Sequence, residues 1–77
     1  MVDMKAVEQH RANLGIPKSV IAKKCGVSVN TYDNWCNKPD TVSAKNSKSL
    51  ADALMITEPS NLIAIFFAPN VQENLNE

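Results

Sequence analysis

The sequence predicts an all-α protein built as a compact bundle of about five short helices. Apolar side chains recur at spacings of three and four residues, which is the period of a helix with one buried face. Serine, glycine and proline stand between these segments, at positions typical of helix ends. With 77 residues, the chain is expected to form one small domain.

The expected domain spans residues 1–68, with a frayed start at 1–3 and a loose acidic tail at 69–77. No stretch approaches the roughly 20 apolar residues needed to cross a bilayer, and the N-terminal residues contain no apolar signal core. We therefore expect a cytoplasmic protein with no membrane partner. Two cysteines are too few for a metal site, and no cofactor is expected.

The first helix is expected at residues 4–13. Val7 and Leu14 share one face at helical spacing and are the expected core anchors. Gly15 ends this helix, and Ile16 can pack on the next one.

Two short helices joined by a tight turn are predicted between residues 17 and 37. In the first, at 17–24, Pro17 suits the first turn because its missing N–H is not needed there. Gly26 ends that helix, since glycine accepts a left-handed backbone at little cost.

The second helix of this pair is expected at residues 29–37. It begins after Ser28, whose hydroxyl can accept a backbone N–H at the helix start. Tyr32 and Trp35 are three positions apart and share a face. We expect these aromatic rings to pack in the core rather than stack on bases.

Two further helices are predicted after a loop at residues 38–41. Ser43 can cap a helix at 44–55, and Thr57 can cap a fifth helix with Pro59 in its first turn. The inward face of the fourth helix is expected to consist of Ala44, Ser47, Leu50, Ala51 and Leu54.

Six consecutive apolar residues begin at Leu62, more than one helix face can bury, because successive side chains point about 100 degrees apart. Leu62, Ile65 and Phe66 are expected to close the core, which leaves Ile63 and Phe67 outside. The run is also compatible with a β-strand, and burial of the whole run in a five-helix core is a third possibility.

Residues 17–37 resemble the helix-turn-helix of the lambda-repressor and Cro type. The matching residues are Ala22, Gly26, Ser28, Tyr32 and Trp35. The flanking helices are similar too, so that the resemblance covers roughly residues 7–62. The family often has Glu and then Gly shortly after the Trp position, where this chain has Cys36 and Lys38. Because that Glu can pair with the Arg of the first helix, Arg11 is expected to lack its usual partner.

The resemblance implies that the second helix of the motif enters the major groove of double-stranded DNA. The residues expected to meet base edges are Val29, Asn30, Asp33 and Asn34. Asparagine can hold adenine through N6 and N7, valine can touch a thymine methyl, and aspartate can accept from cytosine. These pairings favour A·T content in the site. Backbone contacts are expected from Lys18, Ser28, Asn37, Lys38, Lys45 and Lys48.

The formal net charge is zero, but the charges are divided unevenly along the chain. Residues 11–48 hold seven basic side chains against two acidic ones, whereas residues 49–77 hold four acidic side chains and no basic one. The positive part coincides with the helix-turn-helix. This asymmetry is expected when one face of a protein meets phosphates and the other does not.

The first interpretation is a Cro-like repressor, of the kind found in phages and mobile elements, that binds its operator as a homodimer. Ile63, Phe66 and Phe67 form the expected dimer or partner interface, because the family uses this region for dimers. The alternative is a modulator or antirepressor on the same fold that acts by binding a partner repressor. No catalytic residue is predicted, since the sequence has no phosphate-binding loop, metal-ligand spacing or nucleophile motif.

Overall fold

Five α-helices and one 3-10 turn are formed by residues 1–67, the part of the chain that the computed structural model describes. In chain order the elements are α1 (Met4–Leu14), α2 (Lys18–Lys24), α3 (Val29–Asn37), η1 (Pro39–Thr41), α4 (Ala44–Ala53) and α5 (Pro59–Phe66). The predicted all-α bundle is therefore confirmed. The expected domain boundary at residue 68 and the acidic tail at 69–77 lie outside the described residues.

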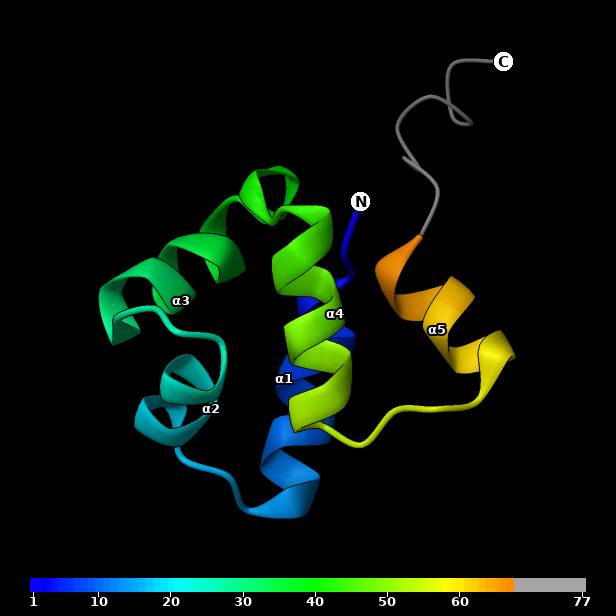
Figure 1. Cartoon of the computed structure of the whole chain (residues 1–77), viewed down its shortest axis with the longest axis horizontal. Coiled ribbons are helices and arrows are strands. Elements are labelled where there is room, and N and C mark those ends of the chain that lie inside the picture. The colour runs from blue at the N-terminus through cyan, green and yellow to red at the C-terminus, as the bar shows by residue number, and fades with distance from the viewer. Residues whose placement is uncertain (68–77) are drawn as a thin grey trace.

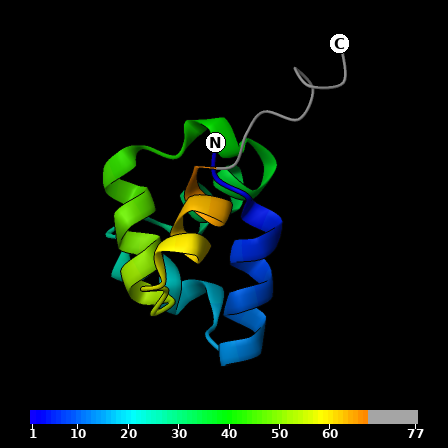
Figure 2. The same cartoon turned by 90° about the vertical axis from the view of Figure 1, so that its right-hand side faces the viewer.

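The two longest helices, α1 and α4, lie between the α2–α3 pair and α5 (Figure 1), and they stand at opposite edges when α5 faces the viewer (Figure 2). On one side, α2 packs against α3 and α4, and α3 also contacts α1 and η1. On the other side α5 packs against α1. As a result α3 and α5 lie at opposite sides of the molecule (Figure 1).

One apolar core joins all five helices. Its buried side chains are Val2, Met4, Val7, Ile21, Ala22, Tyr32, Trp35, Leu50, Ala51, Leu54, Ile56, Ile65 and Phe66. Each helix supplies two of its own buried residues, since helices this short have room for only one buried face. The burial of both α3 aromatic side chains confirms the core position predicted for them.

Local capping explains most of the helix starts. The Oγ atoms of Ser28 and Ser43 each accept a backbone N–H from three residues on, at 3.1 Å, and both predicted caps are confirmed. The cap predicted at Thr57 is wrong, because Glu58 takes the extended N-cap backbone and no side chain caps α5. Pro17 also lies one position earlier than predicted, as the N-cap of α2.

A residue with a left-handed backbone follows three of the helices. Gly15 and Gly26 have φ angles of 69° and 72°, which confirms that these glycines close α1 and the turn after α2. The predicted end of α4 is too late, because the helix stops at Ala53 and Met55 has a φ of 58°. The Ile56 N–H then donates to the Ala51 carbonyl at 2.9 Å, which closes the α4 end in a Schellman-type arrangement.

The first three residues are part of the fold, so the prediction of a frayed start is wrong. Val2 is 4% exposed, the Asp3 side chain caps α1, and the Asp3 N–H donates to the Ile65 carbonyl at 2.6 Å. Val2 and Met4 fill the core at this end of α1. At the other end Leu14 is 43% exposed, so its prediction as a core anchor is also wrong.

The inward face of α4 is shorter than predicted. Leu50, Ala51 and Leu54 are buried as expected, but Ser47 is half-buried and Ala44 is exposed. The first turn of α4 therefore projects beyond the core. This places the start of α4 beside η1, at the same end of the molecule as the last turn of α3 (Figure 1).

Candidate nucleic-acid interface

The orientation of α3 follows from two buried aromatic side chains. Tyr32 is 0% and Trp35 3% exposed, with their rings in an edge-to-face arrangement at a centroid distance of 6.1 Å. Because these residues fix the inner face of the helix, the opposite face looks outward. The exposed residues of that helix are Val29, Asn30, Asn34 and Asn37. The structure thus presents three of the four predicted base-contact residues on one open face.

Asp33, the fourth predicted base-contact residue, is engaged with a predicted backbone-contact residue. Lys18 Nζ donates to Asp33 Oδ1 at 3.0 Å, which joins the first residue of α2 to α3. Asp33 raises the pKa of the Lys18 ammonium, first through this hydrogen bond and then through its charge. The sequence alone does not predict this pair, because a contact across 15 positions leaves no local signal.

A polar network beneath α3 holds the motif on α1. Glu8 accepts two hydrogen bonds from Arg11, at 2.9 Å each, and a third from the hydroxyl of Tyr32. Arg11 also donates to the Ile16 carbonyl at 2.8 Å, in the connection from α1 to α2. Arg11 thus has a partner other than the one usual in the family, because Glu8, three positions earlier, supplies the carboxylate from its own helix.

This network shifts the pKa values of its members. Arg11 lowers the pKa of Glu8 to about 2, chiefly through its hydrogen bonds to the carboxylate, against the opposing effect of burial. Burial raises the pKa of Tyr32 well above its usual range, and the hydrogen bond to Glu8 adds to that effect. Glu8 is therefore charged and Tyr32 neutral at neutral pH. The sequence does carry a signal for the pair of Glu8 and Arg11, as an acid and a base at helical spacing.

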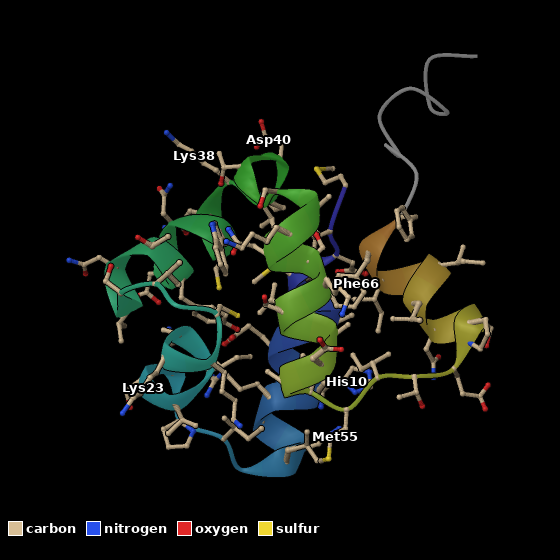
Figure 3. The ribbon with its side chains drawn as sticks, viewed as in Figure 1. His10, Lys23, Lys38, Asp40, Met55 and Phe66 are labelled. Atoms are coloured by element: carbon tan, nitrogen blue, oxygen red, sulfur yellow. The ribbon has the colours of Figure 1, made fainter. Side chains whose placement is uncertain are left out.

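The predicted phosphate contacts fall into two groups. Asn37 ends α3, Lys38 follows it, and Lys45 lies in the exposed first turn of α4, so these three share one end of the molecule. Lys38 points outward there, away from α5 (Figure 3). Ser28 lies at the start of α3, where its hydroxyl also shares a 3.1 Å hydrogen bond with Thr31 Oγ1.

Lys48 does not belong with these residues. Its Nζ donates to Asp52 Oδ2 at 3.3 Å, one turn further along α4. Both side chains line a groove between the first residues of the chain, α4 and α5, on the side away from α2. The prediction that Lys48 contacts the DNA backbone beside α3 is therefore not supported by its position.

That groove, which we call the α4/α5 groove, has a volume of about 580 Å³. Its apolar walls include Val2, Val42, Ile56, Leu62 and Phe66. Phe66 is only 6% exposed and points in toward the bundle (Figure 3), because it closes the core. Its prediction as an interface residue is corrected accordingly.

Two apolar side chains of the 62–67 run remain outside the core. Ile63 is 62% and Phe67 72% exposed, as predicted. Phe67 is also among the residues that line the α4/α5 groove. Residues 62–66 form the last part of α5, so a β-strand at these residues is excluded.

Within the described residues, no helix is long and apolar enough to cross a membrane, and no group of three or more metal-ligating side chains occurs. Cys25 and Cys36 are free and half-buried, and burial raises the pKa of both thiols.

The two-helix motif, its buried aromatic anchors and its open asparagine face define a DNA-binding protein of the helix-turn-helix class. A comparison with protein families matches residues 7–59 to the family HTH_3, described as helix-turn-helix. The chain belongs to this family, whose members include regulators of the lambda-repressor and Cro type. Comparisons with curated proteins and with solved structures found no match.

Proposed function

We propose that the chain is a sequence-specific repressor that binds double-stranded DNA as a Cro-like homodimer, at an operator of a phage or mobile element. The observation that carries the proposal is the outer face of α3, where Val29, Asn30 and Asn34 are exposed while Tyr32 and Trp35 hold the opposite face. The major groove of B-DNA is wide enough to admit one such helix.

Repression would follow from occupation of the promoter. Lys38 and Lys45 flank the end of α3, where cations can fix the register of the helix through phosphate contacts. Asn30 and Asn34, one turn apart, can each hold adenine by its N6 and N7 atoms.

The proposed dimer contact is the exposed pair Ile63 and Phe67. These residues lie on α5 and directly after it, at the side of the molecule opposite α3 (Figure 1). A symmetric contact there would leave both copies of α3 uncovered. Two half-sites about one helical turn of DNA apart would then be read together.

Selection of bound duplexes from a random library, followed by fluorescence anisotropy on the selected duplex at two salt concentrations, tests the proposal. We expect a motif with two related half-sites, centred about 10 base pairs apart. The logarithm of affinity should fall against the logarithm of salt with a slope of about −0.9 per neutralised phosphate. Failure to enrich any sequence would overturn the proposal.

Substitution of Asn30 and Asn34 by Ala separates base reading from general binding. The double variant should lose roughly 1–3 kcal/mol of discrimination for each asparagine replaced, while its affinity for unrelated duplexes stays unchanged. Asn61→Ala, at an exposed position of α5, is the matched control. Equal loss in the control would contradict the assignment of the asparagine face.

The second candidate is a protein-binding modulator, favoured by the α4/α5 groove and by the zero net charge. Such a protein would bind DNA weakly and form a stable complex with a repressor. Size-exclusion chromatography with that repressor would then show a heteromeric complex, which Asn30→Ala and Asn34→Ala leave intact. Tight operator binding by the chain alone would exclude this candidate.

A further inference from the structure

We infer that Lys18 and Asp33 act as one neutral unit in DNA recognition, in which Asp33 selects cytosine and Lys18 positions Asp33. The inference rests on the proposed function and deepens it, because it names the base that one position of the site requires. It also replaces the expectation that Lys18 contacts a phosphate.

The geometry of the pair is the first observation. Lys18 Nζ lies 3.0 Å from Asp33 Oδ1, and the two side chains are 44% and 45% exposed. The pair therefore stands at the surface rather than inside the core. Asp33 follows Asn30 by three positions and precedes Asn37 by four, so it belongs to the same helix face as these asparagines. A duplex in contact with these asparagines would therefore lie close to Asp33.

The second observation is the charge of α3. Asp33 is the one ionisable acid or base among Val29–Asn37 apart from the buried Tyr32 and half-buried Cys36, and it is negative. An uncompensated carboxylate on a helix that enters the groove would be repelled by the phosphates on both sides. Lys18 cancels this charge without contacting DNA itself. With its charge cancelled by Lys18, Asp33 does not hinder the approach of α3 to DNA. Its carboxylate still adds a hydrogen-bond acceptor to the face that the asparagines form.

The third step is the chemistry of the remaining oxygen. Lys18 uses Oδ1, and in the described part of the chain no group donates to Oδ2. A carboxylate oxygen can only accept a hydrogen bond. In the major groove, guanine and thymine present acceptors that repel it, and adenine places an N7 acceptor beside its amino group. Cytosine N4 is a donor without that neighbour, so it suits Oδ2 best.

Three variants, Lys18→Met, Asp33→Asn and the double variant, test the unit by anisotropy. The probes are the duplex selected by the wild-type chain and the three duplexes that replace the proposed cytosine with another base. Salt dependence is measured for each protein. Lys23→Met is the matched control, because Lys23 projects from the same helix and no ion pair joins it to an acid within the described residues (Figure 3).

The expected results are distinct for each variant. Lys18→Met should lower affinity about tenfold or more, since the Asp33 carboxylate then faces the phosphates uncompensated. The salt slope should change by much less than the roughly 0.9 expected for a lost phosphate contact. Asp33→Asn should move the preference at one position from cytosine to adenine, because an amide pairs with N6 and N7. Adding Asp33→Asn to Lys18→Met should restore affinity, since the exposed carboxylate is removed. Lys23→Met should change affinity by less than about twofold.

Two results would overturn the inference while the proposed function stands. One is a salt slope that becomes shallower by about 0.9 in Lys18→Met, which is the mark of a missing phosphate interaction. The other is an Asp33→Asn variant whose base preferences equal those of the wild type. Absence of any selected sequence for the wild-type chain would instead overturn the proposed function. Circular dichroism of each variant separates these outcomes from unfolding.

Discussion

Glu8 links three parts of the helix-turn-helix domain through one carboxylate. Glu8 accepts hydrogen bonds from Arg11 of its own helix and from Tyr32 of α3. Arg11 also donates a hydrogen bond to the Ile16 carbonyl. The burial of Tyr32 follows from its spacing in the sequence alone. The bond to Glu8 does not, because the partner lies 24 positions away and only the packed fold brings the two together.

Replacement of Tyr32 by Phe should measure how much the hydrogen bond between Tyr32 and Glu8 contributes to the free energy of unfolding. The ring stays in the core, but the hydrogen bond to a charged group disappears, so the free energy of unfolding should fall by about 1.5–3 kcal/mol. Urea denaturation measures the change. In a Glu8→Gln background the same replacement should cost clearly less, and an equal cost in both backgrounds would show that the hydroxyl does not act through Glu8.

The Glu8 carboxylate should also give the domain an acid-sensitive stability. Its pKa is lowered from 4.5 to about 2 on folding, so the folded state favours the charged form. This contribution is fully present above about pH 4.5 and is lost as the pH falls toward about 2. Thermal unfolding of wild type and Glu8→Gln across this window measures it. Parallel curves for the two proteins would contradict the assignment to Glu8.

Ionisation of Tyr32 should lower the stability of the domain at alkaline pH. Its pKa is raised in the folded state, so its contribution is present below about pH 10 and is lost as the pH rises further. Unfolding measured between about pH 9 and 11 should show a decline in stability that Tyr32→Phe reduces, while the two half-buried thiols, whose pKa values burial also raises, supply the remainder. A decline of the same size in the variant would assign it to other groups.

At the level of elements, local signals predicted helix starts and ends best. Ser28, Ser43, Gly15 and Gly26 act through backbone groups at most a few positions away, so their roles follow from the sequence alone. Which residues close the two ends of the core could not be predicted from such local signals. Leu14 has the right spacing but stays largely exposed at the end of α1, whereas Val2 is buried in a core that draws on elements far along the chain.

Met55 and Gly26 offer opposite tests of the left-handed helix end. Met55 adopts a φ of 58° with a side chain that is 70% exposed, so Met55→Gly should remove strain at little packing cost. Allowing for the greater freedom of glycine in the unfolded chain, we expect a gain of about 0.5–1 kcal/mol. Chemical denaturation measures it, and a loss of stability would show that the Met55 side chain has packing partners.

The reverse change, Gly26→Ala, should destabilise the domain by about 1–2 kcal/mol. Gly26 has a φ of 72°, and a methyl group there would meet no atom within 4 Å, so the cost arises from the backbone alone. The measurement is again chemical denaturation. A substitution without effect would mean that the turn between α2 and α3 rearranges freely.

For the whole molecule, the sequence predicted the open face of α3 but not the charge pairing on it. The uneven distribution of acids and bases indicated which half would meet phosphates, yet two of the expected cations are engaged by carboxylates. The order of charges along a chain does not reveal such pairs, because Lys18 and Asp33 meet only after α2 and α3 have packed. The exposure of Ile63 and Phe67 was predictable, since one helix face cannot bury the whole run.

Sedimentation of variants on α5 should decide the assembly of the whole molecule. If the chain dimerises through Ile63 and Phe67, then Phe67→Ser should raise the dimer dissociation constant about tenfold or more, as burial of one such side chain is worth about 1.5–3 kcal/mol. Val20→Ser, at a 40% exposed position on α2, is the matched control. A dimer that survives Phe67→Ser but not Val20→Ser would move the interface to the other side of the molecule.

The bond between Asp3 and Ile65 has a consequence for synthesis. It closes a loop that spans almost all of the described chain, and contacts of such high sequence separation form late because loop closure costs entropy. While α5 is still inside the exit tunnel of the ribosome, the hydrogen bond between Asp3 and Ile65 therefore cannot form, and the first residues of the nascent domain are not yet held in place. α3, which packs mainly against its neighbours in sequence α2 and η1, can form before the bond between Asp3 and Ile65 closes.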